Sequence, residues 1–323
     1  MRRIYAFNGD ADGLCALQQL RLAESRDTLL EAELVSGTKR ETTLVSRVRA
    51  SAGDRVTVLD MSFEGNRGSV ERLLAAGAHV RYFDHHYAGA PFEHAGFEPY
   101  LDSSAATCTS AIVDRYLKGR ERLWAIVGAF GDNLDETAAA LADVERVPQD
   151  RRAQLRRLGV ALNYNAYGET EADLFYAPLA LHERLIGYRD PFEFIAGDRA
   201  FDTLWQGYSG DLALTEAILP VEASACAAAY RLPDAPWARR VNGVFANRLA
   251  RASPQRAHAV LLPTTLGGVT VSVRAPLERP SGAAALCRGY PGGGGREGAA
   301  GITNLPLADV SDFLRRFMAH FSM

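Results

Sequence analysis

The chain has 323 residues, of which 47% are hydrophobic, and its formal net charge is −3 at pH 7. This length and apolar content suffice for two domains with cores of their own. The charge argues against binding to duplex DNA or to membranes through a general basic field, so an anionic substrate must be held locally, by metal ions or a few arginines. Nearly all cationic residues are arginine, with Lys39 and Lys118 as the lysines. Rigid phosphate-binding forks or a GC-rich coding sequence explain this bias equally well.

The cysteines are isolated, so neither a zinc-binding pair nor a small disulfide framework is expected. They are Cys15, Cys108, Cys226 and Cys287. Each is predicted to be a small buried residue in a reducing cytoplasm. Because no apolar run reaches membrane-spanning length, we expect a soluble, cytoplasmic protein.

Short apolar runs alternate with amphipathic segments in the first part of the chain. Strands are predicted at residues 3–7, 32–36, 55–59 and 79–83, and helices at 13–22, 40–50 and 66–76, the last closed by Gly77. This order predicts a parallel sheet with right-handed crossovers. A further helix is expected at 103–117, capped by Ser103 or Ser104. Residues 124–130 fit either a buried helix or a strand, and the helix is preferred.

The remainder predicts a helical region and then a mixed one. Residues 136–230 read as several helices with breaks at Pro148, Gly159, Pro178, Pro191 and Pro220. Strands are expected at 241–245, 257–262 and 267–274, helices at 281–287 and 307–321, and a glycine-rich loop at 292–301. The predicted fold class is α/β. A parallel-sheet domain (1–165), a helical connector (166–235) and a smaller α/β domain with a mixed sheet (236–323) are expected.

Four apolar segments end in side chains that bind metal ions. The endings are Asn8-Gly9-Asp10-Ala11-Asp12, Asp60, Asp84-His85-His86 and Asp132. One Asp in such a place is usually a turn former or a helix cap, but four endings are hard to obtain by chance. Residues just past the strand ends of a parallel sheet converge. Carboxylates with one imidazole suit Mn²⁺ or Mg²⁺, and two bridged ions would balance the charge and clamp a phosphoryl group.

Two features near the C-terminus favour a phosphate or nucleotide contact. Residues 292–301 offer backbone N–H groups beside the guanidinium of Arg296. A glycine run is equally typical of a flexible loop, and Arg274 is ambiguous by itself, but the two together favour anion binding. The polar and aromatic turn at 163–168 fits either a substrate contact or packing at a domain junction.

The order of these motifs resembles that of the DHH phosphoesterases with a C-terminal DHH-associated domain, in the branch of the nano-RNases and RecJ. The resemblance covers nearly the whole chain. Asn8-x-Asp10-x-Asp12-Gly13 resembles the first motif, Asp60 the second, Asp84-His85-His86 the third and Gly131-Asp132 the fourth. Ser272-x-Arg274 and residues 293–301 resemble the signature of the C-terminal domain.

The resemblance implies a role for each matching residue. Asp10 and Asp60 would bind one Mn²⁺ ion, and Asp12, Asp60, His85 and Asp132 the other, with Mg²⁺ as an alternative metal. Asn8 replaces the family's histidine, and its amide oxygen is a weaker ligand. Asp84 would orient the histidines, and His86 would touch the scissile phosphate. Substrate would be bound in an interdomain cleft by Arg274, Gly293, Gly294, Gly295 and Arg296, the last standing where the family has histidine.

The expected function is hydrolysis of short nucleotides, either linear dinucleotides or small oligoribonucleotides, by two-metal activation of water. A nucleoside bisphosphate phosphatase, a polyphosphate hydrolase and a catalytically impaired nucleotide sensor are the alternatives. The expected partner is a small nucleotide or short single-stranded oligonucleotide, with neither duplex DNA nor a membrane. Whether the chain forms a homodimer stays open.

Overall fold

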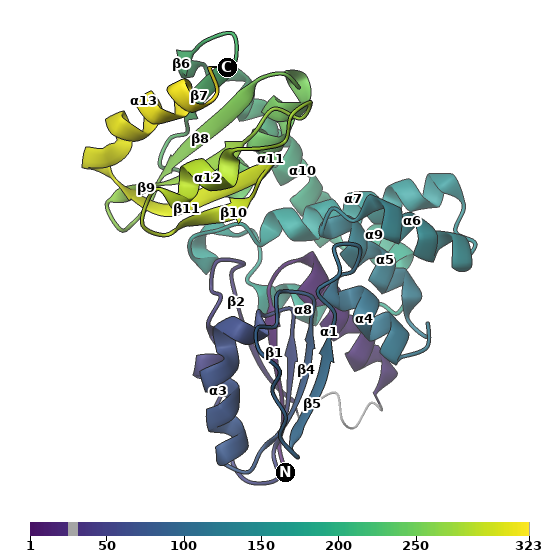
Figure 1. The fold of residues 1–323 in the computed structure, drawn as a ribbon. Coiled ribbons are helices and arrows are strands. Elements are labelled where there is room, and N and C mark those ends of the chain that lie inside the picture. Colours follow the sequence, from purple (N-terminus) through teal and green to yellow (C-terminus); the bar gives the residue numbers. More distant parts are fainter. Residues whose placement is uncertain (25–31, 323) are drawn as a thin grey trace. The chain divides into compact units, whose positions relative to one another are not determined.

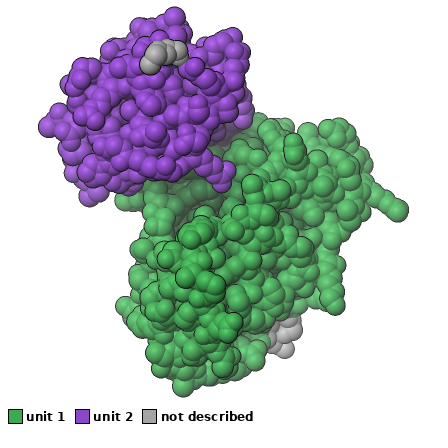
Figure 2. All heavy atoms as spheres, viewed as in Figure 1, with its two compact units in different colours: residues 1–206 green, residues 207–323 purple. Residues whose placement is uncertain are grey.

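The computed structural model describes residues 1–24 and 32–322. The chain divides into two compact units, residues 1–206 and 207–323 (Figure 2). The first contains a five-stranded parallel sheet and the second a six-stranded mixed sheet, which confirms the predicted α/β class. Among the described residues, none of the helices has the length and apolar content needed to cross a membrane.

The sheet of the first unit has the strand order β2-β1-β3-β4-β5. Its strands are β1 (Arg3–Asn8), β2 (Ala32–Gly37), β3 (Arg55–Leu59), β4 (His79–Asp84) and β5 (Phe97–Leu101). The first four were predicted from their apolar runs. The sequence analysis missed β5, which contains Glu98 and Pro99 and pairs with β4 alone. An edge strand tolerates proline and a solvent-facing charge, so its sequence lacks the signal of a buried strand.

Helices cover both faces of this sheet (Figure 1). One face packs against α1 (Ala11–Ala23), α4 (Thr109–Tyr116) and α5 (Arg122–Gly131), with α7 (Gln149–Asn165) behind them, and the other against α3 (Phe63–Ala75). The helix expected at 124–130 is confirmed as α5. The helix expected at 40–50 is wrong. A single 3₁₀ turn, η1 (Leu44–Arg47), is enough to bury Leu44, Val45 and Val48 in the core beside α3.

Two other predicted features of the first unit are corrected. Helix α4 begins at Thr109 instead of Ser103, because its first N–H groups bind the carboxylate of Asp12. Gly159 is no break, since it lies inside α7 where that helix closely approaches α5. The other elements here are α6 (Asp135–Val144), η2 (Glu171–Asp173), α8 (Pro178–Leu185) and α9 (Pro191–Gly197).

Helix α10 (Arg199–Leu214) continues across the boundary between the units and is followed by η3 (Thr215–Ala217). The helical region was predicted to extend to Tyr230, but it ends at Ala217. Residues 220–223 and 227–231 form strands instead. The sheet of the second unit has the order β10-β11-β9-β8-β7-β6. Its strands are β6 (Pro220–Ala223), β7 (Ala227–Arg231), β8 (Ala257–Pro263), β9 (Gly268–Arg274), β10 (Gly293–Arg296) and β11 (Ala299–Pro306).

Helix α11 (Pro236–Ala252) covers one face of this sheet, and α12 (Ala283–Arg288) and α13 (Val310–His320), which follows η4 (Leu307–Asp309), cover the other. The strand predicted at 241–245 is wrong. Ala238, Val241 and Phe245 are buried at helical spacing in α11, a period that only a longer window reveals. The loop predicted at 292–301 is also wrong, because β10 and β11 pair there as a hairpin.

Gly159 tests the packing of α7 on α5. A Cβ at this position would lie 2.3 Å from the carbonyl oxygen of Val127, a backbone atom that has little room to move. We expect Gly159→Ala to lower the free energy of unfolding by roughly 1–3 kcal/mol through overpacking. Urea unfolding followed by circular dichroism measures this. The control is Gly68→Ala in α3, where a Cβ meets nothing within 4 Å. The free energy of unfolding of Gly68→Ala should rise by about 0.5–1 kcal/mol. Equal stability of the two variants would contradict the close contact of α7 with α5.

Candidate metal site

The residues predicted to bind metal converge at one edge of the first unit's sheet. Asp10 and Asp12 follow β1, Asp60 follows β3, and Asp84 ends β4. These strands are adjacent and parallel, so their carboxyl ends share an edge. All four carboxylates are almost completely buried, with exposed fractions of 2% or less. The expected convergence of separate segments is therefore found.

His85 lies at the centre of this cluster. Its Nε2 atom is 3.4 Å from Oδ1 of Asp60, 3.8 Å from Oδ2 of Asp132 and 3.9 Å from Oδ2 of Asp12. Its Nδ1–H donates to the carbonyl oxygen of Thr107 at 3.1 Å, which leaves the lone pair of Nε2 directed at the carboxylates. One ion about 2 Å from each donor would fit among atoms separated in this way.

The N-terminus of α4 holds two of these carboxylates in place. Both oxygens of Asp12 accept hydrogen bonds, from the N–H groups of Thr109 and Ser110, each at 2.7 Å. The hydroxyl of Thr109 donates to Oδ1 of Asp60 at 3.1 Å. Asp60 has φ 58°, a left-handed conformation that aspartate tolerates better than most residues. Asp132 comes from a different element, as the C-cap of α5.

Asp84 contacts His86 instead of the shared cluster. Its Oδ1 atom lies 2.6 Å from Nδ1 of His86, and its Oδ2 accepts from the N–H of Phe63 at 3.0 Å. Burial would lower the pKa of His86, but the hydrogen bond with Asp84, together with the charges of Asp84, Asp10 and Asp12, raises it. The contact with Asp84 also fixes the orientation of the His86 ring.

Lys39 is a member of the site that the sequence analysis did not identify. Its Nζ atom lies 2.5 Å from Oδ2 of Asp10, whose Oδ1 accepts from the N–H of Gly13 at 3.0 Å. Lys39 stands two residues past the end of β2, the neighbour of β1 in the sheet. The reasoning from strand ends that found the aspartates would have found this residue had it been applied to cations.

The electrostatics of the cluster favour the binding of a cation. Burial and then the charges of Asp10 and Asp12 raise the pKa of Asp60 well above its usual value. Burial and then Asp12 raise the pKa of Asp132 to about 6. Burial opposes ionisation of Asp10 as well, but Lys39, together with the hydrogen bonds from Gly13 and Asp60, lowers the pKa of Asp10. Buried carboxylates at this density need compensating positive charge.

The donor atoms fit a hard divalent ion. Within the described residues, two groups of donor atoms lie within 4.8 Å of one another. One comprises Asp12, His85 and Asp132, and the other Asp60, His85 and His86. Carboxylate oxygens with imidazole nitrogen suit Mn²⁺ or Mg²⁺. Asp10 belongs to neither group, and the side-chain oxygen of Asn8 accepts from the N–H of Asp10 at 3.3 Å.

The residues predicted to bind substrate lie in the second unit. Arg274 ends β9 and Arg296 ends β10, and both pair with Ala299 of β11, so the two arginines share one row of the sheet. The guanidinium of Arg274 donates from Nε to Oδ1 of Asn247 at 2.7 Å. Gly293, Gly294 and Gly295 form the edge strand β10, and Gly295 has φ 135°. Their role in binding substrate stays a prediction.

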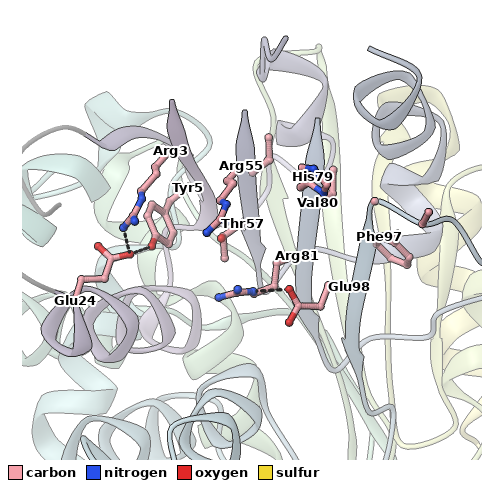
Figure 3. A pocket seen from close by; sticks show the side chains of 13 residues that line it. Arg3, Tyr5, Glu24, Arg55, Thr57, His79, Val80, Arg81, Phe97 and Glu98 are labelled. Carbon is pink, nitrogen blue, oxygen red and sulfur yellow. Dashed lines mark hydrogen bonds and ion pairs between the residues drawn. The ribbon is translucent and has the colours of Figure 1, made fainter. Parts of the chain in front are cut away.

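A polar hollow of about 640 Å³ lies at the other end of the first unit's sheet (Figure 3). Arg3, Arg55 and His79 line it, and each is the first residue of its strand, whereas the metal-site residues follow the last. Figure 3 shows Arg3 directed at Glu24 and Arg81 bonded to Glu98. Most of the charged side chains that line the hollow therefore form ion pairs with one another. The hollow is separate from the candidate site.

The pKa values predict how stability depends on pH in protein stripped of divalent ions. The folded state holds a proton on Asp132 up to about pH 6, whereas the unfolded chain releases it near pH 3.8. Stability should therefore fall as pH rises through this window and stay lower above it. The raised pKa values of Asp60 and His86 act in the same direction.

Thermal unfolding in EDTA between pH 5 and 8 measures this, and the melting temperature should fall with rising pH. Adding Mn²⁺ should raise the melting temperature more at pH 7.5 than at pH 5.5, because protons compete for the same carboxylates. Asp132→Asn should weaken the pH dependence. A stabilisation by Mn²⁺ that is equal at both pH values would count against the cluster as its binding site.

Sequence comparison finds no family model that matches this chain and no similar curated protein. Solved structures do match it along almost its full length. The manganese-bound exonuclease RecJ matches with a TM-score of 0.66 and 18% identity, over 99% of this chain and 90% of that one. A DHH domain from a protein described as belonging to a family of ribosomal proteins matches with a TM-score of 0.65 and 12% identity, over 98% of this chain and 86% of that one.

A pGpG-specific phosphodiesterase, PggH of Vibrio cholerae, matches with a TM-score of 0.56 and 13% identity, over 100% of this chain and 99% of that one. At these identities the likeness is one of fold. It agrees with the parallel sheet and second domain expected from the motifs. The resemblance stated from the sequence is thereby confirmed, and the chain has the two-domain fold of the DHH phosphoesterases.

Proposed function

We propose that this chain is a Mn²⁺-dependent phosphodiesterase that hydrolyses short nucleotides, namely linear dinucleotides or small oligoribonucleotides. The observation that carries the proposal is the position of His85 Nε2, 3.4–3.9 Å from oxygens of three buried or largely buried carboxylates. The fold supports it, since similar structures are described as an exonuclease bound to manganese and as a pGpG-specific phosphodiesterase.

In this proposal Asp12, Asp60, His85 and Asp132 hold a divalent ion. Such an ion would supply Lewis-acid polarisation of the phosphoryl group and activation of a water molecule. His86 donates a hydrogen bond from Nε2 to a phosphate oxygen, because Asp84 occupies its Nδ1 and favours the charged ring. The backbone of α4 keeps Asp12 fixed while charge develops on the phosphoryl group.

The number of ions depends on Asp10, Asn8 and Lys39. The resemblance implies two Mn²⁺ ions bridged by Asp60. Asp10 would be a ligand of the first ion, and Asn8 would contribute a weak oxygen to it. The contacts of Lys39 with Asp10 bear directly on that first position.

The charges of the chain bear on the size of its substrate. The net charge of −3 argues against a long polyanion held by a basic surface, and so favours a small substrate. Arg274 and Arg296 stand two strands apart in one row, which is roughly 10 Å at the usual strand spacing. We propose that they bind separate anionic groups of the nucleotide. The fork of Arg296 suits a terminal phosphate or the edge of a guanine.

The direct test is incubation with pGpG, with and without Mn²⁺, followed by chromatography of the mononucleotides. We expect release that requires the ion and stops with EDTA. Asp60→Asn should reduce kcat by at least about 100-fold, since it removes a charged ligand from the transition-state environment. Asp143→Asn is the matched control, because that exposed carboxylate pairs with Arg152. Near-normal turnover by Asp60→Asn would refute the proposed site.

Arg296→Ala tests the second unit. If Arg296 binds the substrate's anionic group equally in the ground and transition states, the variant should raise KM about 10-fold with kcat nearly unchanged. Arg288→Ala, at the exposed end of α12, is the control and should leave both constants alone. A variant of Arg296 with unchanged KM for every nucleotide tested would remove this residue from the proposal.

A nucleotide sensor that binds without turnover is the second candidate. It is favoured by the amide of Asn8 where the family has an imidazole. Binding of pGpG measured by calorimetry, together with no release of mononucleotide at any Mn²⁺ concentration, would select it. A panel with nucleoside bisphosphate and polyphosphate distinguishes the phosphatase and polyphosphate alternatives.

A further inference from the structure

Asp10 and Asn8 are engaged in ways that leave little for a metal ion. Oδ1 of Asp10 caps α1 by accepting from Gly13, and its Oδ2 lies 2.5 Å from Nζ of Lys39. The side-chain oxygen of Asn8 accepts from the N–H of Asp10 at 3.3 Å, so it is turned toward its own backbone. Among the described residues, Asp10 belongs to neither of the two groups of carboxylate and imidazole donors.

We propose that the ammonium group of Lys39 takes the place of one of two metal ions, so that the site holds a single divalent ion beside a fixed lysine. The remaining ion is the one coordinated by Asp12, Asp60, His85 and Asp132. The inference deepens the proposed function and rests on it only for the identity of the ion. It concerns the number of cations, which the reaction catalysed does not determine.

Lys39 is held in this position from both ends. Its backbone N–H donates to the carbonyl oxygen of Ala166 at 3.2 Å. Its Nζ lies 5.3 Å from the centre of the ring of Tyr167, within the range of a cation–π interaction. The side chain is 26% exposed. The turn at 163–168, for which the sequence left two interpretations, thus contributes an aromatic ring to this site.

The charges of the site are consistent with this arrangement. Nζ of Lys39 lies 2.5 Å from Oδ2 of Asp10, so the ammonium group faces the cluster directly. Asp84 is engaged by His86, whose Nδ1 lies 2.6 Å from its Oδ1. The other four aspartates then face one ammonium and one divalent ion. A second divalent ion on Asp10 would lie against the ammonium and be repelled by it.

The loss of an imidazole from the first motif and the presence of a lysine beside Asp10 occur together in this chain. Where the family has a histidine that binds the first ion, this chain has Asn8, and a lysine enters from the end of β2. A lysine presents three N–H donors, of which Asp10 takes one. In this proposal the others compensate phosphate charge, which is one of the tasks that a first metal ion performs.

The test is a count of bound metal in the full chain. Protein is saturated with Mn²⁺, desalted and analysed by elemental mass spectrometry and by electron paramagnetic resonance. We expect one Mn²⁺ per chain and the spectrum of an isolated ion. Two ions per chain with an exchange-coupled spectrum would overturn the proposal.

Variants of the chain test which residue determines the number of bound Mn²⁺ ions. The double variant Asn8→His with Lys39→Ala should restore the first position, doubling the bound Mn²⁺ and producing the coupled spectrum. Lys118→Met, which removes the other lysine of the chain, should leave the count at one. A double variant that still binds one isolated ion while circular dichroism shows it folded would contradict the role of Lys39. The wild-type count needs no variant and decides the question if the double variant fails to fold.

These outcomes are separate from those of the activity assay. One bound ion with no release of mononucleotide would support the lysine and refute the phosphodiesterase. Release of mononucleotide by protein that binds two coupled ions would support the phosphodiesterase and refute the lysine.

Discussion

Compensation of buried negative charge is the constraint on which this structure depends. Asp10, Asp12, Asp60 and Asp84 are almost wholly inaccessible to solvent, and each receives a different partner. Lys39 contacts Asp10, the first N–H groups of α4 bind Asp12, and His86 contacts Asp84. Asp60 accepts from the hydroxyl of Thr109 and lies 3.4 Å from Nε2 of His85, and burial together with the charges of Asp10 and Asp12 raises its pKa. A cation at the centre of the cluster would offset these charges.

The partners also determine where the elements begin and end. Helix α4 begins at the residue whose N–H meets Asp12, and the preceding segment places the carbonyl of Thr107 against His85. One short stretch therefore positions an acid and an imidazole that lie far apart in the sequence. Carboxylates held by backbone groups need little reorganisation when charge changes nearby. In the proposed function such a cluster acts at a phosphate, and in the further proposal one side chain, Lys39, decides between one ion and two.

Strand pairing determines where the candidate substrate-binding residues of the second unit lie. Pairing of β9, β11 and β10 brings Arg274 and Arg296 into one row, although a helix and a glycine-rich segment separate them in the sequence. A Cβ at Gly295 would lie 2.5 Å from Cα of Ala300, so glycine there permits the hairpin to close. The glycines thus serve strand pairing first, and any anion binding would be added to that role.

By itself the sequence determined the α/β class, the parallel strands and the aspartates and histidines of the metal cluster, because apolar runs ending in charged residues are local patterns. It missed β5, whose edge position tolerates glutamate and proline, and it mistook part of α11 for a strand because five residues do not reveal a helical period. Three features were decided only by tertiary structure: the start of α4, the hairpin at β10 and the contact of Lys39 with Asp10. The start of α4 depends on Asp12 and the contact of Lys39 on Asp10, both distant in the sequence, and β11 of the hairpin pairs in turn with β9. No local pattern encodes which distant charge a buried carboxylate will meet.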